Sequence, residues 1–214
     1  MSPTAPRTLR DTLTVFGQHT SPRLLLAASA VAVLARVAVG ALTGWDLVVA
    51  AAIFAWWPIQ EWLIHVLLLH FVPRTIAGRR IDPHNARKHR AHHREPNDLA
   101  LVFIPLRSIL TTLPLVVLGA LLLFPTTPLA LTAIASFVLL SLHYEWCHTL
   151  AHVPYAPKIA YYQRICRSHM LHHHRNERAW YGVSRTLADT LFGTDPDGAS
   201  TPPSPTVKTL GIEG

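Results

Sequence analysis

Four long apolar runs, separated by polar segments, constrain this chain more than any other feature. They cover residues 24–42, 46–71, 99–124 and 129–150. The second run is long enough to cross the ~30 Å hydrocarbon core of a bilayer as a helix. A backbone in lipid must satisfy its own hydrogen bonds, which a helix does. The runs therefore predict an all-α integral membrane bundle of about four transmembrane helices, with polar helical segments forming a cap.

The composition excludes two other classes of protein. Hydrophobic residues make up 50% of the 214 residues and charged residues 14%, which is the reverse of a disordered chain. The two cysteines form no CxxC pair and are too few for a disulfide scaffold.

The basic residues follow the pattern of a membrane protein. A net charge of +7 would by itself suggest a nucleic-acid partner. However, 16 of the 19 Lys and Arg lie before residue 24, between residues 72 and 98, or between residues 151 and 194, whereas the turns near Gly44 and Thr126 carry none. The positive-inside rule then places both termini and these segments in the cytosol. The spans exclude a nucleic-acid-binding function.

Polar segments flank the membrane region. Residues 1–23 are predicted to be a cytosolic lead-in, residues 24–194 the membrane-embedded domain, and the Pro-, Ser- and Thr-rich residues 195–214 a disordered tail. One alternative for the first apolar run is a signal peptide, because residues 28–30 (Ala-Ser-Ala) resemble a cleavage site. Pro105 and Pro114 are predicted to kink the third run.

Histidine is the most unusual residue type, since 13 of the 14 histidines lie between His65 and His174. Ten of them form four clusters that all fall at one predicted membrane face. Residues three or four apart share a helix face, which favours converging metal ligands over solvated side chains. The clusters are His65 and His70; His89, His92 and His93; His148 and His152; and His169, His172 and His173.

Ten ligands are too many for one metal ion but suit two ions with five imidazoles each. One position per ion then remains for oxygen or water. Imidazole binds zinc, copper, iron and nickel; zinc fits a hydrolase or a structural site, and iron fits oxygen chemistry. His65 and His70 lie about 140° apart on an ideal helix, so either they bind different ions or the helix end unwinds. No catalytic residue is predicted beyond the ligands.

Two carboxylates stand near these clusters. Glu61 precedes His65 by four residues and Glu145 precedes His148 by three, so each is predicted to accept an N–H from a ligating imidazole. Arg36, inside a span, is left to pair with Glu61 or with a lipid headgroup. The remaining histidines are predicted not to be ligands; they are His19, His84, His143 and His174. A supporting or substrate-side role stays open for His174.

The boxes HxxxxH, HxxHH, HxxxH and HxxHH, in this order, resemble the fatty acid hydroxylase / sterol desaturase superfamily. The resemblance runs from His65 to about Thr194. The eighteen-residue gap between His70 and His89 is most similar to the fatty acid 2-hydroxylases. Residues 180–184 and 189–194 resemble the closing signature of the family, with Ala188 where tryptophan is common.

The resemblance implies a non-haem di-iron monooxygenase of lipid metabolism, with the ten histidines holding two iron ions and zinc possible in purified samples. It implies hydroxylation of a lipid acyl chain, most simply at the 2-position, with O₂. The sequence holds no His-Pro-Gly-Gly haem segment and no Gly-rich nucleotide fingerprint. Electrons are therefore expected from a separate donor protein, for which the basic loops offer a dock. The lack of a retrieval signal favours a bacterial plasma membrane.

Other functions stay open at this point. A carotenoid hydroxylase or a sterol or lipid desaturase would use the same boxes. A non-oxidative zinc-binding membrane protein or a metal transporter would belong to another class, and a transporter would need polar residues along a path through the bilayer. The sequence predicts neither the exact substrate nor the oligomeric state.

Overall fold

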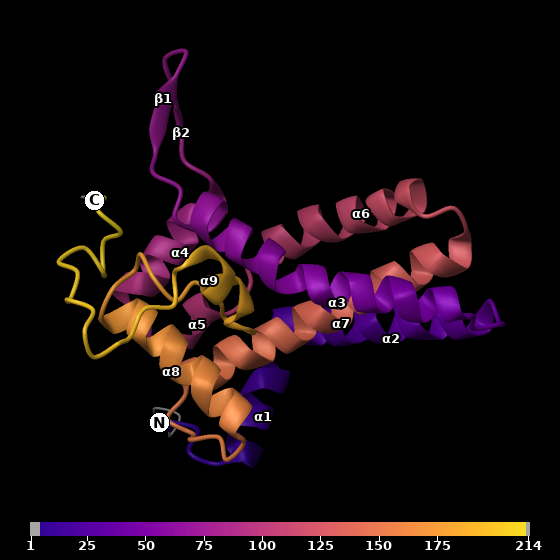
Figure 1. Cartoon of the computed structure of the whole chain (residues 1–214), viewed down its shortest axis with the longest axis horizontal. Helices are drawn as coiled ribbons and strands as arrows, with labels where there is room; N and C mark the ends of the chain where they lie inside the picture. Colours follow the sequence, from indigo (N-terminus) through magenta and orange to yellow (C-terminus); the bar gives the residue numbers. More distant parts are fainter. Residues whose placement is uncertain (1–4, 213–214) are drawn as a thin grey trace.

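One long helix, α7 (Thr127–His152), forms the centre of the bundle. The computed structural model, which describes residues 5–212, packs α2 (Thr20–Ala38), α3 (Gly44–Ile64) and α6 (Leu106–Leu123) around it (Figure 1). These helices, together with the short segments that continue two of them, are long and apolar enough to cross a membrane. The predicted all-α, four-span membrane bundle is confirmed.

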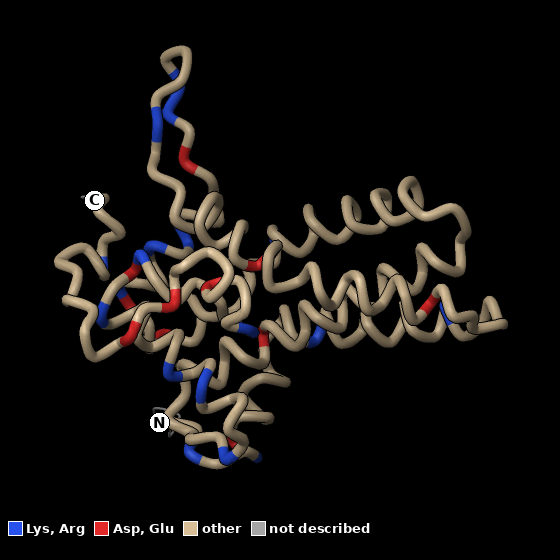
Figure 2. Tube along the Cα trace, viewed as in Figure 1, with Lys and Arg blue, Asp and Glu red and all other residues tan. Residues whose placement is uncertain are grey.

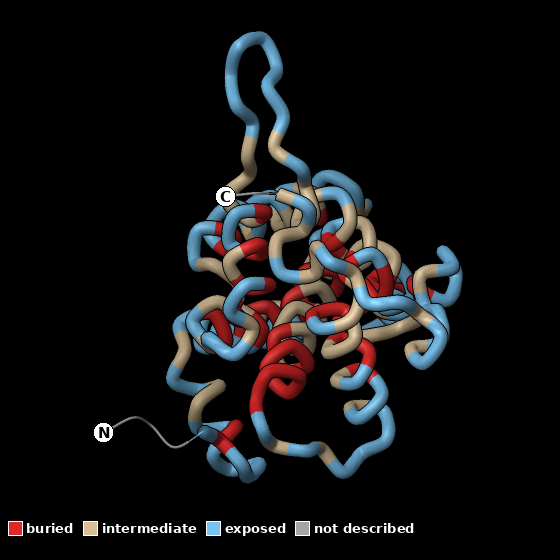
Figure 3. The backbone as a smooth tube through the Cα atoms, turned by 90° about the vertical axis from the view of Figure 1, so that its left-hand side faces the viewer, coloured by how far each residue is buried: buried red, intermediate tan, exposed pale blue. Residues whose placement is uncertain are grey.

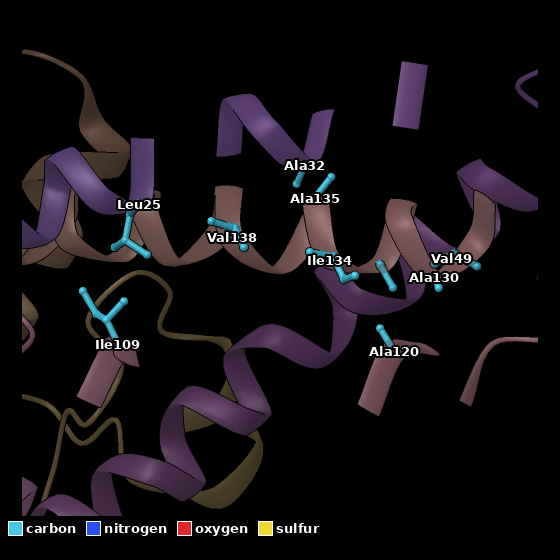
Figure 4. Packing of buried hydrophobic residues seen from close by; sticks show 10 residues of the cluster. Leu25, Ala32, Val49, Ile109, Ala120, Ala130, Ile134, Ala135 and Val138 are labelled. Atoms are coloured by element: carbon cyan, nitrogen blue, oxygen red, sulfur yellow. The ribbon is translucent and has the colours of Figure 1, made fainter. Parts of the chain in front are cut away.

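Small side chains allow these helices to approach one another closely. The buried Ala32 of α2 lies beside Ala135 of α7, and Val138 is fully buried in the same cluster (Figure 4). Such residues are typical of helix contacts in membranes. On the outside, large apolar side chains such as Leu34 and Leu122 are exposed, which suits contact with lipid. The first apolar run thus forms α2, which packs against α7 within the bundle.

The third apolar run is not one continuous helix. It begins as α5 (Leu99–Val102), passes through an extended Phe103, and resumes as α6 after Pro105. Proline lacks an N–H and disfavours helical backbone in the residue before it. The kink predicted at Pro105 is thus a break, whereas Pro114 lies within α6.

Arg36 is buried at the end of the bundle that lies opposite the histidines. Its guanidinium pairs with Asp46 at 2.8 Å and donates to the hydroxyl of Thr132 at 2.9 Å. Asp46 also accepts the backbone N–H of Thr43 and so caps α3. Arg36 therefore pairs with neither of the partners considered from the sequence, because Asp46, ten residues later, turns back toward it.

Replacing Asp46 by leucine is expected to lower the Tm by roughly 5–10 °C, because it leaves the Arg36 charge buried and uncompensated. The double variant Arg36→Met/Asp46→Leu should recover most of this loss, since an apolar pair has no charge to desolvate. Thermal unfolding in detergent measures both effects. Equal losses in the single and double variants would show that the ion pair itself is not the source of the stability.

The charged cap is built from helices that lie beside the histidine end of the bundle. They are α4 (His84–Arg94), α8 (Ala160–His174), α9 (Leu187–Phe192) and α1 (Leu9–Gln18). Lys, Arg, Asp and Glu gather at this end, while most of the bundle carries none (Figure 2). Buried segments lie in the centre of the cap (Figure 3), so this polar end has an interior of its own.

Two segments outside the helices differ from what the sequence suggested. A hairpin of β1 (Arg74–Ile76) and β2 (Arg79–Ile81) projects from the cap (Figure 1). Its turn places Ala77 and Gly78 at positive φ, as a two-residue hairpin turn requires. The tail at residues 195–214 was predicted to be disordered, but its described part, up to residue 212, contacts the cap through several hydrogen bonds. The lead-in boundary at residue 23 falls inside α2.

Candidate metal centre

The ten histidines predicted as ligands come together in two groups of five at the capped end of the bundle. Within each group, one possible ligand atom from every ring lies within 4.8 Å of the others. All the rings are buried except that of His70, which is partly buried. We call the two sets histidine groups 1 and 2. Group 1 consists of His65, His70, His89, His93 and His172, and group 2 of His92, His148, His152, His169 and His173.

Each HxxHH box contributes to both groups. Helix α4 gives His89 and His93 to group 1 and His92 to group 2; α8 does the reverse, with its outer pair in group 2 and His172 in group 1. An α-helix turns about 100° per residue. Residue i+4 therefore lies about 40° from residue i, whereas residue i+3 lies about 60° away on the other side. The second histidine of each box, His92 in α4 and His172 in α8, thus faces the neighbouring group.

A π-helical turn brings His65 and His70 into the same group. After α3, residues His65–Leu69 form the π-helical turn η1, in which the N–H of His70 bonds to the carbonyl of His65 at 3.0 Å. Such i→i+5 turns are rare and occur frequently at functional sites. Of the two possibilities left by the five-residue spacing, the local change of helix is the one found, and the two ring centroids are 5.0 Å apart.

The spacing of the ring nitrogens fits a metal ion. In group 1, Nε2 of His89 lies 3.0 Å from Nε2 of His65 and 3.1 Å from Nε2 of His93; group 2 has the same spacing. With metal–nitrogen bonds of about 2.1 Å, ligands at right angles are about 3.0 Å apart, and tetrahedral ligands about 3.4 Å. The contacts match nitrogens at right angles about a shared centre, so the five imidazoles of each group could hold an ion that takes more than four ligands.

The protonation of the group 1 rings also fits a cation. Burial lowers the pKa of His172 to about 4 and holds the pKa of His93 well below its usual range, so both rings are neutral at pH 7. Their Nε2 atoms lie 3.1 Å apart and face each other as lone pairs, which repel unless a cation lies between them. A carbonyl only accepts, so a neutral ring whose Nδ1 donates to one has its lone pair on Nε2. Three rings of group 1 do so at 2.6 to 2.9 Å: His65 to Tyr181, His93 to Val207, and His172 to Ala179.

Group 2 is held differently. The Nδ1 atoms of His92, His169 and His173 are buried and have no hydrogen-bond partner among the described residues 5–212. Packing against neighbouring rings, rather than bonds to carbonyls, sets the orientation of these three imidazoles. Group 1 is therefore the more firmly prearranged of the two, because ligand-orienting hydrogen bonds fix both tautomer and ring direction.

Glu61 supports His65 through the backbone rather than directly. Its carboxylate accepts the N–H groups of Val183 and Ser184 and the indole N–H of Trp57. This fixes the segment whose Tyr181 carbonyl accepts from His65. The imidazole–carboxylate bond predicted for Glu61 is absent from the described residues, because the carbonyl of Tyr181 takes its place.

Asp189 holds the other side of the same segment, a role that the reasoning from residue types missed. It accepts the N–H groups of Tyr181 at 2.8 Å and Gly182 at 2.7 Å, and the hydroxyl of Thr194 at 2.7 Å. The only sequence signal for it was the closing signature of the family, in which this aspartate follows the 180–184 stretch.

Glu145 likewise binds no histidine among the described residues. It is fully buried and accepts the N–H of Ile104 at 3.0 Å and the hydroxyl of Ser21. It therefore connects α7 to the start of α2 and to the break before α6. The predicted bond from His148 is replaced by these contacts, which fix the helix that carries His148 and His152.

The four histidines predicted not to be ligands lie outside both groups. His19 stacks on Phe103 with ring centroids 3.8 Å apart. His143 contacts the thiol of Cys147 at 3.6 Å. The ring centroid of His174 is 6.5 Å from that of its neighbour in group 2, and His84 lies at the cavity described next.

A cavity of about 490 Å³ runs up to both groups. Its wall includes His65 and His89 of group 1 and His92 and His148 of group 2. The remaining wall is mostly apolar and comes from all four membrane helices and from α5, including Leu25, Ile64, Leu68, Val102, Ile109 and Val138. Such a slot suits an apolar chain with one reactive position held against the histidines.

Fold and site together define a multi-pass membrane protein with paired histidine-rich sites that fit metal ions at the end of an apolar cavity. The sequence model of the fatty acid hydroxylase family matches residues 50–194. The chain belongs to this family.

Two known proteins are similar to the chain. The dihydroceramide fatty acyl 2-hydroxylase FAH2 of Arabidopsis thaliana is 30% identical over 152 residues, which are 70% of this chain and 61% of that protein; the chain thus spans about three fifths of its length. The solved structure of full-length scs7p, in which only the hydroxylase domain is visible, superposes with a TM-score of 0.64 at 18% identity, covering 94% of this chain and 71% of that one. This likeness shows a shared fold.

Proposed function

We propose that this protein is a membrane di-iron oxygenase that hydroxylates a lipid acyl chain near its polar end, most simply at the 2-position. The observation that carries the proposal is the apolar cavity, whose wall contains histidines of both groups. Family membership and the similarity to a fatty acyl 2-hydroxylase support the reaction class and the position.

The ten histidines are proposed to hold two iron ions, five imidazoles to each. Five imidazoles with right-angled nitrogen spacing would favour an ion that takes more than four ligands over four-coordinate zinc. When bound, the iron pair supplies the activation of O₂, so that one oxygen atom enters a C–H bond and the other leaves as water with two electrons and two protons. Zinc in purified samples is consistent with this proposal, because imidazole sites bind Zn²⁺ more tightly than Fe²⁺.

The protein itself positions the ligands and the chain. Glu61 and Glu145 act as positioning residues through the backbone and helices that they hold. The apolar wall aligns an acyl chain and excludes water from the reacting carbon. No side chain is needed to move a proton at the C–H bond.

The extent of the enzyme unit, its place in the cell and its electron source belong to the same proposal. Residues 24–194 form the hydroxylase unit. The charged cap and both ends of the described chain lie at one end of the bundle (Figure 2), which supports a cytosolic position for the histidines in a bacterial plasma membrane. Electrons come from a separate protein that approaches this basic face.

A metal transporter is disfavoured by the core of the bundle. Between the cavity and the opposite end, the helices pack through buried apolar residues such as Ala32, Ile134 and Ala135. A polar path through the membrane is what transport would require.

Lipid mass spectrometry on a host that expresses the protein with a compatible electron donor tests the proposal. We expect lipids that are one oxygen heavier with the wild type and none with His172→Ala/His173→Ala, which removes one ligand from each group. Fragmentation locates the hydroxyl. Lipids two hydrogens lighter would indicate a desaturase, and a hydroxylated carotenoid would overturn the acyl-chain substrate. Unchanged lipids with well-expressed protein would contradict oxygenase activity.

A further inference from the structure

We propose that the polar mouth of the cavity binds an anionic headgroup, so that the substrate is an acidic lipid, carrying a phosphate or a carboxylate, rather than an uncharged one. The inference rests on the proposed function and deepens it by naming the substrate class. The mouth is formed where the first turn of α4 meets the first turn of α6. His84 and Lys88 come from α4, and Arg107 from α6.

Exposed cations and a second hollow lie at this end of the cavity. A second hollow of about 240 Å³ adjoins it and shares His84, Asn85, Arg107 and Ser108 with it. The side chains of Lys88 and Arg107 are exposed, in contrast to the buried histidines at the inner end. A lipid that enters here brings its headgroup to these cations and its apolar chain to the wall beyond them.

The cations at the mouth have no protein counter-ion. Neither Lys88 nor Arg107 takes part in the ion pairs found among residues 5–212. The one carboxylate in the cavity wall, Glu61, is already fully engaged with backbone and side-chain donors. Burial together with the positive charges of Arg107, Arg87 and Lys88 lowers the pKa of His84. An unneutralised positive field of this kind attracts an anion.

Backbone groups add to the same field. Helix α4 begins after Pro83 and α6 after Pro105, and neither N-terminus has a side-chain cap. No side chain among residues 5–212 therefore accepts from the first amide N–H groups of either helix, and each helix dipole is positive at this end. Ser108 donates to Asn85 at 2.6 Å, which keeps the two helix starts together. Such N-termini are ready-made anion sites.

The mouth is close to the histidines. Asn85 precedes His89 by four residues and His84 precedes His92 by eight, which are about 6 and 12 Å along a helix that rises 1.5 Å per residue. An anionic group bound at the mouth therefore brings the first carbons of its chain, rather than the middle of the chain, to the two groups. This agrees with oxidation near the polar end.

Equilibrium binding of radiolabelled lipids to the purified full-length protein in detergent, with metal as isolated and no electron donor, tests the site. The probes are phosphatidic acid, a free fatty acid and ceramide with matched acyl chains. We expect both ionised lipids, or one of them, to bind about tenfold more tightly than ceramide. The tighter of the two assigns phosphate or carboxylate as the headgroup.

Three variants assign the effect to the mouth. Lys88→Gln/Arg107→Gln should remove the preference, and Lys88→Arg/Arg107→Lys should keep it. Arg79→Gln/Arg80→Gln removes the same charge from the exposed hairpin and should also keep it. The proposal would be overturned if the wild type bound ceramide as tightly as the ionised lipids. It would also be overturned if Lys88→Gln/Arg107→Gln kept the preference for ionised lipids, or if the hairpin variant lost it to the same extent. Competition by inorganic phosphate as effective as that by lipid would overturn it too, because the site would then take a free anion.

The outcome is separable from that of the proposed function. Binding is measured without turnover, so the anion preference can hold in a protein that hydroxylates nothing. Conversely, a host containing hydroxylated ceramide, with binding indifferent to Lys88 and Arg107, would support the hydroxylase and contradict the anionic substrate.

Discussion

His93→Ala and His173→Ala are each expected to leave the protein with about one metal ion per chain instead of about two, and to reduce lipid hydroxylation about 100-fold or more. His93 belongs to group 1 and His173 to group 2. Loss of residues that merely orient a ligand costs 10- to 100-fold in metal affinity or activity, so loss of a ligand itself should cost at least as much. Elemental analysis of the purified variants measures the metal, and product lipids measure the activity.

His143→Ala is the matched control, because His143 lies on α7, outside both groups. It should keep about two ions and full activity. The two ligand variants should also differ from each other, since carbonyls orient three rings of group 1, whereas the Nδ1 atoms of three rings of group 2 have no partner among the described residues. The ion left in His173→Ala is held by group 1 and should resist removal by a chelator longer than the ion left in His93→Ala, which is held by group 2. Two full metal equivalents in both ligand variants would contradict the assignment of one ion to each group.

The sequence predicted the membrane spans and the set of ten histidines because both depend on local patterns. Apolar runs of sufficient length can hardly be anything but spans, and histidines three or four apart share a helix face wherever the helix lies. The division of each HxxHH box between two groups depends on where α4 and α8 lie relative to each other. That arrangement comes from long-range packing, which spacing along the chain does not contain.

The carboxylates show the same limit. Glu61 stands four residues before His65, so a direct bond was the simplest expectation. Its backbone partners, Val183 and Ser184, are more than 120 residues away. The tail was predicted to be disordered from its composition, yet the carbonyl of Val207 accepts from His93. Backbone groups carry no residue-type signal, so no motif could have revealed that contact.

Gly182→Ala is expected to reduce lipid hydroxylation about 10- to 100-fold and to lower the metal content of group 1. A Cβ at this position would overlap the carbonyl oxygen of Arg185 and lie 2.8 Å from a carboxylate oxygen of Asp189. Because the first contact is with backbone, the 180–184 segment must move. The bond from Gly182 to Asp189 would then break, and the Tyr181 carbonyl would shift from the ring of His65 that it orients.

Gly198→Ala separates this effect from a general cost of adding a methyl group to the cap. Its Cβ would meet Leu171 Cδ1 at 2.9 Å, the end of a flexible side chain that can rotate away, so activity should stay within about twofold of the wild type. The Tm of both variants in detergent shows whether they are folded. If Gly182→Ala were folded and retained full activity and metal, the 180–184 segment, which Glu61 and Asp189 hold, would have no part in orienting His65. The ring would then be held by its packing alone, as are three rings of group 2.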